Sequence, residues 1–191
     1  TYIAHQIGDS DIGKYVWTLS FTGIFALFME FGLSRVLTRE VAKDYSKAKL
    51  YLANVLGIKL FLAAITIILA VVTVNFMGRE PVVVLMVYVA CAIIVLDTFT
   101  QTFYSVFRAF QILKYEALGI IIYQIVIVTS GFLVIQLSLG LKALIAAVLL
   151  GSVFNFCYSL VLLLIKGKLK PHFAFNRRMV KFISVSYTHL R

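Results

Sequence analysis

The stretch ALGIIIYQIVIVTSGFLVIQLSLGL, residues 117–141, decides the fold, because it runs for 25 positions without a charged side chain. A helix needs about 20 apolar residues to cross the hydrocarbon layer of a bilayer, which is ~30 Å thick. In lipid the backbone must satisfy its own hydrogen bonds, so a run of this length is a helix rather than an isolated strand. The alternating pattern of a transmembrane barrel strand does not occur in it. The stretch therefore predicts a transmembrane helix.

Four further runs are apolar enough to make the same crossing, and they extend over residues 15–33, 51–78, 81–107 and 143–165. Composition agrees with a membrane protein. Of the 191 residues, 62% are hydrophobic and 14% are charged, whereas a soluble domain is about half apolar and a quarter charged. The sequence thus predicts an all-α, polytopic transmembrane helix bundle with about five complete spans. These are expected near residues 12–36, 51–77, 81–108, 115–139 and 142–166.

The segment after the first span predicts the orientation. Residues 34–49 are helical in pattern but heavily charged, so we expect them to continue the first helix and then turn at the cytoplasmic surface. If this segment is cytoplasmic and later loops alternate sides, thirteen basic residues face the cytoplasm and three (Lys14, Arg79 and Lys142) face outward. Such an excess is the positive-inside signal of membrane proteins. The cytoplasmic set is Arg35, Arg39, Lys43, Lys47, Lys49, Arg108, Lys114, Lys166, Lys168, Lys170, Arg177, Arg178 and Lys181.

The segment GDSDIGK, residues 8–14, has the spacing of a phosphate-binding loop. It is followed by Tyr15, where such a loop needs Ser or Thr to bind Mg²⁺, and no strand precedes it. Asp9 and Asp11 would also repel phosphate. A helix N-cap by one of the residues at positions 9–11 explains the same sequence. No nucleotide site is expected here.

The residues that carry enzymatic or redox chemistry are scattered. The histidines lie in loops or near chain ends without a neighbouring carboxylate pair, whereas a membrane-embedded enzyme needs a cluster at one interface. The cysteines lie within apolar runs and support neither a disulfide framework nor a zinc site. The basic clusters are not interleaved with exposed aromatics, which disfavours nucleic-acid binding. We expect a non-enzymatic protein without a metal or cofactor. The residues concerned are His5, His172, His189, Cys91 and Cys157.

Three charged side chains, Glu30, Lys59 and Asp97, lie within the predicted spans and away from their ends. Each is costly in lipid unless it faces protein or water. Lys59 is long enough to snorkel to the cytoplasmic surface, but the two acids are too short to reach far. A hydrated cavity is one explanation for Glu30 and Asp97, and a static intrahelical ion pair is the other.

Two polar faces extend from these positions. Asp97 shares one face of the third span with Gln101 and Arg108, at helical spacing. Glu116 opens the fourth span, with Tyr123 on about the same side. Together these residues predict a polar path along the two spans. A position at the membrane interface is the alternative explanation for Arg108 and Glu116.

The fifth span carries small or polar residues at every fourth position. Small residues let transmembrane helices approach closely, so this stripe predicts a packing seam. The stripe consists of Ala143, Ala147, Gly151, Asn155 and Ser159.

Several short motifs resemble one family of membrane proteins. They include GKY at 13–15, FGL at 31–33, REVAKD at 39–44 and YLANVLGIKL at 51–60. The segments FRAF at 107–110 and YEAL at 115–118 are similar to a later stretch of the same family. The chain, up to about residue 182, thus resembles the polysaccharide-biosynthesis flippases. These are the bacterial and archaeal O-antigen and teichoic-type exporters of the multidrug/oligosaccharidyl-lipid/polysaccharide superfamily.

The resemblance implies a fold of two six- or seven-helix bundles around a central cavity. The sequence would then supply helices two to six of the first bundle, which is one lobe of a two-lobed transporter. Residues 1–7 would end helix one, and the C-terminal bundle would be missing. Residues 183–191 depart from the family pattern and are expected not to be native family sequence.

The resemblance also implies a function: movement of a polyprenyl-diphosphate-linked oligosaccharide from the cytoplasmic to the outer leaflet of a bacterial or archaeal plasma membrane, by alternating access. Basic residues would bind the diphosphate, and amide and phenol groups would bind the sugars. The intramembrane acids would balance the cations or bind a coupling ion. Two alternatives stay open, a cation-coupled multidrug or small-solute antiporter of the same fold and a structural membrane subunit. The expected cavity residues are Glu30, Arg35, Arg39, Lys59, Asp97, Gln101, Arg108, Glu116, Tyr123 and Asn155.

Overall fold

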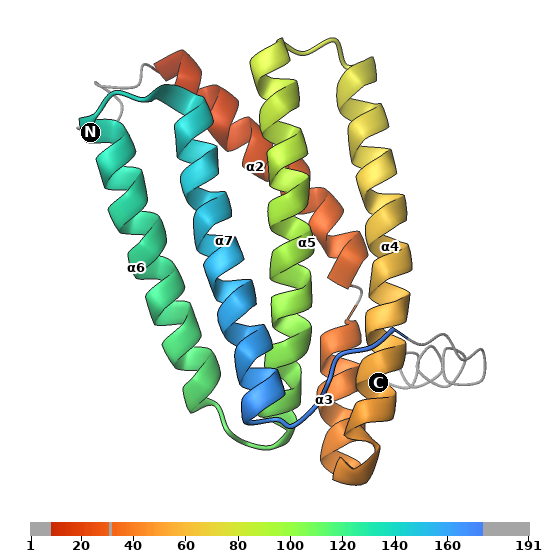
Figure 1. The fold of residues 1–191 in the computed structure, drawn as a ribbon. Helices are drawn as coiled ribbons and strands as arrows, with labels where there is room; N and C mark the ends of the chain where they lie inside the picture. The colour runs from red at the N-terminus through yellow and green to blue at the C-terminus, as the bar shows by residue number, and fades with distance from the viewer. Residues whose placement is uncertain (1–8, 31, 174–191) are drawn as a thin grey trace.

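The computed structural model of the chain describes residues 9–30 and 32–173, and every regular element among these residues is a helix. Figure 1 shows α6, α7, α5 and α4 side by side, with α2 running obliquely across them and leading into α3. The expected end of helix one (residues 1–7), the chain end at 183–191, and Arg177, Arg178 and Lys181 lie outside the described residues. The elements are α2 (Asp9–Glu30), α3 (Leu33–Lys43), the 3₁₀ helix η1 (Tyr45–Lys47), α4 (Ala48–Phe76), α5 (Pro81–Ala109), α6 (Lys114–Gln136) and α7 (Gly140–Ile165).

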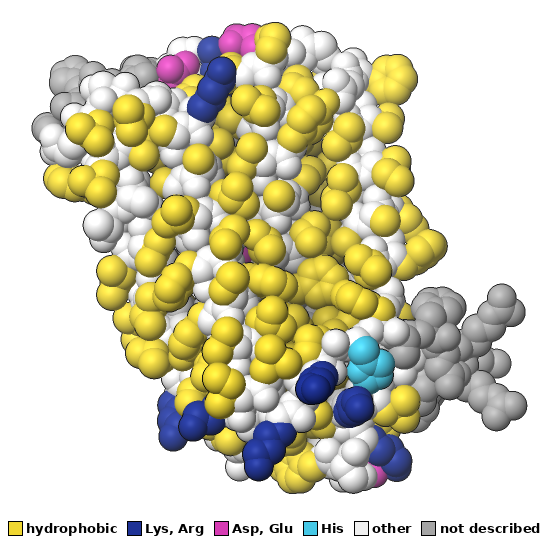
Figure 2. All heavy atoms as spheres, viewed as in Figure 1, with side chains coloured by type: hydrophobic (Ala, Val, Ile, Leu, Met, Phe, Trp, Pro, Cys, Tyr) yellow, Lys and Arg dark blue, Asp and Glu magenta, His cyan; other side chains and the backbone are white. Residues whose placement is uncertain are grey.

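Five helical segments among the described residues are long and apolar enough to cross a membrane, which confirms the predicted all-α transmembrane bundle. Figure 2 shows a broad band of apolar side chains over these helices, with Lys and Arg gathered below it. The lower end carries the α5–α6 connection and α3. This distribution agrees with the predicted orientation, in which that end is cytoplasmic. The protein is a multi-pass membrane protein.

The first span is broken, whereas the sequence predicted one helix through this region. Gly32 lies between α2 and α3 with φ 70° and ψ 5°, which is the left-handed conformation. Glycine adopts it without the steric penalty that a Cβ brings. The backbone N–H groups of Arg35 and Val36 donate to the Gly32 carbonyl, so α3 begins directly after the turn. The apolar pattern hid this break because the turn needs no polar residue.

The charged segment that follows the break forms the short amphipathic helix α3 and then η1. Its buried face, which includes Val36, Leu37 and Val41, packs on α4 and α5. Asp44 ends α3 and caps η1, accepting a hydrogen bond from the Ser46 backbone N–H at 3.0 Å. Bonds from the Lys47 ammonium and the Ser46 hydroxyl hold the pKa of Asp44 at about 2, so the cap is ionised at physiological pH.

Helix α5 lies at the centre of the bundle and is the most buried span. One apolar cluster joins it to α3 and α4 at the lower end, and two others join it to α7 and to α4 and α2 at the upper end. Helix α6 lies at the edge of the row in Figure 1 and has one fully buried residue, Gly119. Most of the α6 surface therefore faces outward from the described part of the chain.

The stripe on the fifth span forms the predicted packing seam. A Cβ added to Gly151 on α7 would lie 2.6 Å from Cγ1 of Ile127 on α6. On the facing helix, a Cβ added to Gly119 would lie 2.0 Å from the hydroxyl of Tyr104 on α5. Both distances are shorter than any real carbon contact. The glycines are therefore what lets α5, α6 and α7 approach so closely.

Candidate functional site

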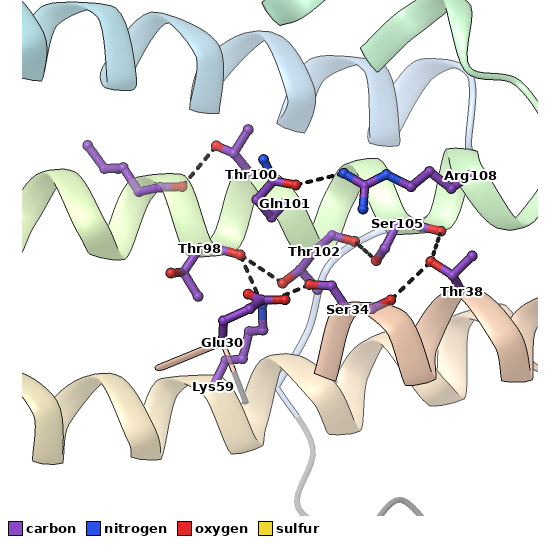
Figure 3. Close-up of polar contacts among 11 residues, drawn as sticks. Glu30, Ser34, Thr38, Lys59, Thr98, Thr100, Gln101, Thr102, Ser105 and Arg108 are labelled. Carbon is purple, nitrogen blue, oxygen red and sulfur yellow. Dashed lines mark hydrogen bonds and ion pairs between the residues drawn. The ribbon is translucent and has the colours of Figure 1, made fainter. Parts of the chain in front are cut away.

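Lys59 on α4 is the centre of the first polar group, although its side chain is completely buried. Its ammonium donates to Oε2 of Glu30 at 2.6 Å, to Oγ of Ser34 at 3.0 Å and to the carbonyl oxygen of Thr98 at 3.2 Å. These three acceptors satisfy the three donors of a lysine ammonium. Figure 3 shows Lys59 pointing from α4 toward Glu30, Ser34 and Thr98. The lysine thus lies among protein groups and does not snorkel to the cytoplasmic surface.

The position of this ion pair explains the break in the first span. Glu30 is the last residue of α2, and Ser34 lies in the first turn of α3. Lys59 therefore holds both sides of the left-handed turn at Gly32. A cation is also favoured at the C-terminal end of α2, where carbonyl groups point outward. The pair joins two helices, so it is not the intrahelical pair that the sequence left open for Glu30.

A ladder of hydroxyl groups continues from Lys59 along the contact between α3 and α5. Thr102 donates to the Thr98 carbonyl at 2.9 Å, and Ser105 donates to the Thr102 carbonyl at 2.6 Å. Thr38 on α3 closes the ladder by donating to the Ser105 carbonyl at 3.1 Å. Figure 3 shows these side chains in one line. Of these three bonds, the one from Thr38 joins α3 to α5, and the other two lie within α5.

Arg108 is the centre of the second polar group. Its Nε donates to Oε2 of Glu116 at 2.7 Å, and its Nη2 donates to Oε1 of the same carboxylate and, at 2.7 Å, to Oε1 of Gln101. Arg108 is 31% exposed, which separates it from the wholly buried Lys59. Of these two cations, only Arg108 is within reach of a molecule that arrives from outside the bundle.

The Arg108 side chain extends away from the lower membrane surface. Gln101, which it contacts, lies seven residues earlier on α5, or about 10 Å along the helix axis. Figure 3 shows the guanidinium pointing back along α5 toward Gln101. Side chains on a helix lean toward its N-terminus, which for α5 is the upper end. An arginine that anchors a helix at the headgroups would extend in the opposite direction.

The two charged groups are close enough to act on each other. Arg108 interacts electrostatically with both Glu30 and Lys59. The four side chains, two acids and two bases, sum to zero charge. The structure therefore brings together four of the predicted cavity residues and balances their charges.

Asp97 belongs to a third group, formed by α5, α6 and α7. Its carboxylate and the Tyr123 hydroxyl both lie beside Ser152. The Ser152 hydroxyl is buried and completes no hydrogen bond of regular geometry within the described chain. Asp97 is only partly buried and forms no ion pair among the described residues. It is thus the intramembrane acid that the described structure leaves without a cation.

The structure engages the remaining predicted residues elsewhere. Asn155 accepts a hydrogen bond from the Tyr104 hydroxyl at 2.6 Å, inside the contact between α5 and α7. Arg39 lies 3.1 Å from Oε1 of Glu40, and Arg35 is exposed on α3. The bond of Asn155 thus belongs to the seam between α5 and α7, and the contact of Arg39 with Glu40 lies on α3.

Among the polar residues that the structure buries, Glu40 and Ser152 were not predicted from the sequence. Glu40 is 3% exposed, and Lys43 contacts its carboxylate at 2.8 Å. A helical projection of residues 33–43 would have found it, since Glu40 falls on the apolar face of Leu33 and Leu37. Serines carry no comparable signal, because they also occur throughout lipid-facing helices.

The comparisons with known proteins give one result. A protein-family model described as "Polysaccharide biosynthesis protein" matches residues 1–190. No curated protein and no solved structure matches the chain. Within the described residues no group of three or more His, Cys, Asp or Glu side chains is placed to bind a metal ion.

Proposed function

The chain belongs to the polysaccharide biosynthesis protein family, and from this premise we propose that it is the first lobe of a flippase. Its substrate would be an oligosaccharide linked to a polyprenyl diphosphate, moved from the cytoplasmic to the outer leaflet of a bacterial or archaeal plasma membrane. A headgroup of sugars and phosphates cannot cross hydrocarbon unaided, so a transporter must offer polar groups along its path. The lobe described here would act with a second bundle by alternating access. This is a transport function and not an enzymatic one.

The observation that supports this function best is the geometry of Arg108. It is a partly exposed cation that points into the membrane and presents two N–H groups in parallel. A guanidinium in this form binds a phosphate through two hydrogen bonds. In the proposed function Arg108 binds the diphosphate, Arg35 and Arg39 attract it at the cytoplasmic mouth, and Gln101 and Tyr123 bind sugars.

Lys59 takes a different part in this proposal from the one that the sequence suggested. Its three donors are all bound to protein groups, and its side chain is inaccessible. We assign Lys59 and Glu30 to holding the angle between α2 and α3. Asn155 is assigned to the seam between α5 and α7, because Tyr104 occupies its amide oxygen.

A cation-coupled antiporter of the same fold is the second candidate, and Asp97 is the observation that favours it. A carboxylate without an ion pair inside a transmembrane bundle is a suitable site for a proton or metal cation. Ser152 and Tyr123 would supply neutral oxygen ligands beside it. In the flippase, Asp97 would bind the coupling ion instead.

A structural membrane subunit is the third candidate. Such a subunit would have its polar residues only where helices pack together. Arg108, Gln101 and Asp97 instead stay partly exposed along one face of α5. This face supports a transport path over a structural role.

Reconstitution of the full-length protein in liposomes tests the proposed function. A fluorescent oligosaccharide on polyprenyl diphosphate is placed in both leaflets, and an impermeant glycosidase then digests the accessible half. A flippase makes nearly all of the lipid accessible, whereas protein-free liposomes protect about half. Protection equal to that of empty liposomes, together with cation-driven uptake of a dye, would favour the antiporter instead.

A further inference from the structure

The bond between Arg108 and Glu116 has the form of an arginine–phosphate contact. Nε and Nη2 of Arg108 donate to the two different oxygens of one carboxylate, so the guanidinium is gripped along one edge. Carboxylate and phosphate present paired oxygens to this edge in the same planar geometry. A phosphate that reaches Arg108 must therefore compete with Glu116 for the same two N–H groups.

Exposure makes this competition possible at Arg108. The Arg108 side chain is 31% exposed and that of Glu116 is 13% exposed, whereas Lys59 is fully buried. An incoming anion can thus reach the guanidinium without unpacking the helices around it. In the nearby Glu30–Lys59 pair the cation is inaccessible, and its charge is balanced by Glu30.

Glu116 also has support for its charge when Arg108 releases it. It lies in the first turn of α6, which begins at Lys114. The backbone N–H groups at a helix N-terminus have no partner within the helix and stabilise a negative charge there. Exchange of the carboxylate for a phosphate therefore leaves no unsupported anion in lipid.

A transporter needs this kind of competition because it must release what it binds. With Glu116 neutral, the four side chains Glu30, Lys59, Arg108 and Glu116 would carry one net positive charge. They would then bind a diphosphate tightly whether the transporter is open to the cytoplasm or to the outside. With Glu116 ionised, each phosphate contact replaces an existing ion pair. The affinity of Arg108 for phosphate is thereby kept low, and the Glu116 carboxylate can pair with Arg108 again when the phosphate leaves.

We propose that Glu116 is an internal competitor that occupies the phosphate-binding edge of Arg108 and limits the affinity of this site for isoprenyl diphosphates. The proposal rests on the proposed function, in which Arg108 meets the diphosphate. Glu116 is a positioning and release residue in this scheme, and Arg108 is the group that touches the substrate.

The test uses the full-length protein in nanodiscs, with farnesyl diphosphate as the probe and calorimetry as the measurement. Glu116→Gln should bind the probe about tenfold or more tightly than the wild type, since the loss of a charge-assisted competitor is of this order. Glutamine keeps the size of the side chain and one oxygen acceptor for Arg108, so the fold is retained. Glu80→Gln, on the outer connection, is the matched control and should bind like the wild type.

Two further variants test whether the tighter binding of the probe acts through Arg108. Arg108→Ala should abolish binding, and the double variant Arg108→Ala with Glu116→Gln should also fail to bind, because the tighter binding acts through the guanidinium. Equal or weaker binding by Glu116→Gln, or binding that persists without Arg108, would overturn the proposal. If Glu116→Gln binds the probe more tightly but the protein fails the liposome assay, the proposed flippase function is refuted and the role of Glu116 is not. If the liposome assay succeeds but Glu116→Gln does not bind more tightly, only the role of Glu116 is refuted.

Discussion

The ammonium of Lys59 on α4 lies 2.6 Å from the carboxylate of Glu30, the last residue of α2, inside the apolar band of the bundle. The same ammonium binds Ser34 on α3, on the other side of the left-handed residue Gly32. One buried lysine thus fixes the angle at which the first span changes direction. This contact and the Arg108–Glu116 pair account for the intramembrane charges apart from Asp97 within the described chain.

Breaking the Glu30–Lys59 pair should destabilise the protein, and the loss should depend on which of the two residues is replaced. Glu30→Gln leaves a fully buried ammonium without its counter-charge, and we expect a loss of about 3 kcal/mol in the free energy of unfolding. Lys59→Met should cost less, because the Glu30 side chain is 37% exposed, whereas protein completely encloses that of Lys59. Thermal unfolding of the full-length variants in detergent measures the difference.

The double variant Glu30→Gln with Lys59→Met completes this comparison. It removes both charges, so it should be more stable than Glu30→Gln alone. Additive losses, or a larger loss for Lys59→Met than for Glu30→Gln, would contradict the buried position of the lysine.

Gly32 offers an independent test of the break between α2 and α3. Alanine in its left-handed conformation costs roughly 1–2 kcal/mol, so Gly32→Ala should lower the melting temperature of the full-length protein. Gly32→Asn should cost less, because asparagine tolerates this conformation. Equal melting temperatures for the alanine variant and the wild type would mean that α2 and α3 form one continuous helix.

The spans were predictable because apolar length alone determines where a chain crosses a membrane. Residues 117–141 have no charge to conceal their role, and the same holds for residues 143–165. The break at Gly32 was not predictable in the same way. It depends on a backbone dihedral angle and on a lysine 27 positions later, and neither leaves a periodic signal.

The charged residues of the polar site could be predicted from the sequence, but their pairing could not. The cost of ionisable groups in lipid identifies Glu30, Lys59 and Asp97 from the sequence. Helical spacing places Gln101 and Arg108 on one face. Which acid pairs with which base depends on how the helices pack. The ion pair between Arg108 and Glu116 is therefore known only from the structure.

The close contact of α5 and α6 predicts a specific sensitivity at Gly119. A methyl group there would lie 2.0 Å from the Tyr104 hydroxyl, which is fully buried and bonded to Asn155. Gly119→Ala should therefore destabilise the protein by about 1–3 kcal/mol, as overpacked cores do. Gly131→Ala is the matched control on α6, since its nearest neighbour, Leu144, would be 4.0 Å away. Equal melting temperatures for the two variants would argue against the packing of α6 in this structure.

The predicted orientation can be tested by chemical labelling. After Cys91 and Cys157 are replaced by serine, single cysteines at Ser46, Gln111 and Gly167 should react with an impermeant maleimide only in inverted membrane vesicles. The reason is the excess of basic residues beside these three positions. A cysteine at Gly78, on the opposite side, should react only in right-side-out cells. Labelling of two of the first three from outside the cell would reverse the topology.

Export of glycan by Arg108 variants tests the central claim, that Arg108 binds the substrate's diphosphate. Surface glycan is measured in a strain that lacks its own flippase, with each full-length variant normalised to its amount in the membrane. Loss of a charge-assisted contact is worth ~1.5–3 kcal/mol, so Arg108→Ala should cut export at least tenfold at equal expression. Arg108→Lys should restore only part of it, because an ammonium cannot bind two phosphate oxygens along one edge. Arg79→Ala, which removes an outer arginine that lies over Trp17, should export nearly as well as the wild type. Export by Arg108→Ala equal to that by Arg79→Ala would show that Arg108 is an interfacial anchor and would contradict the account.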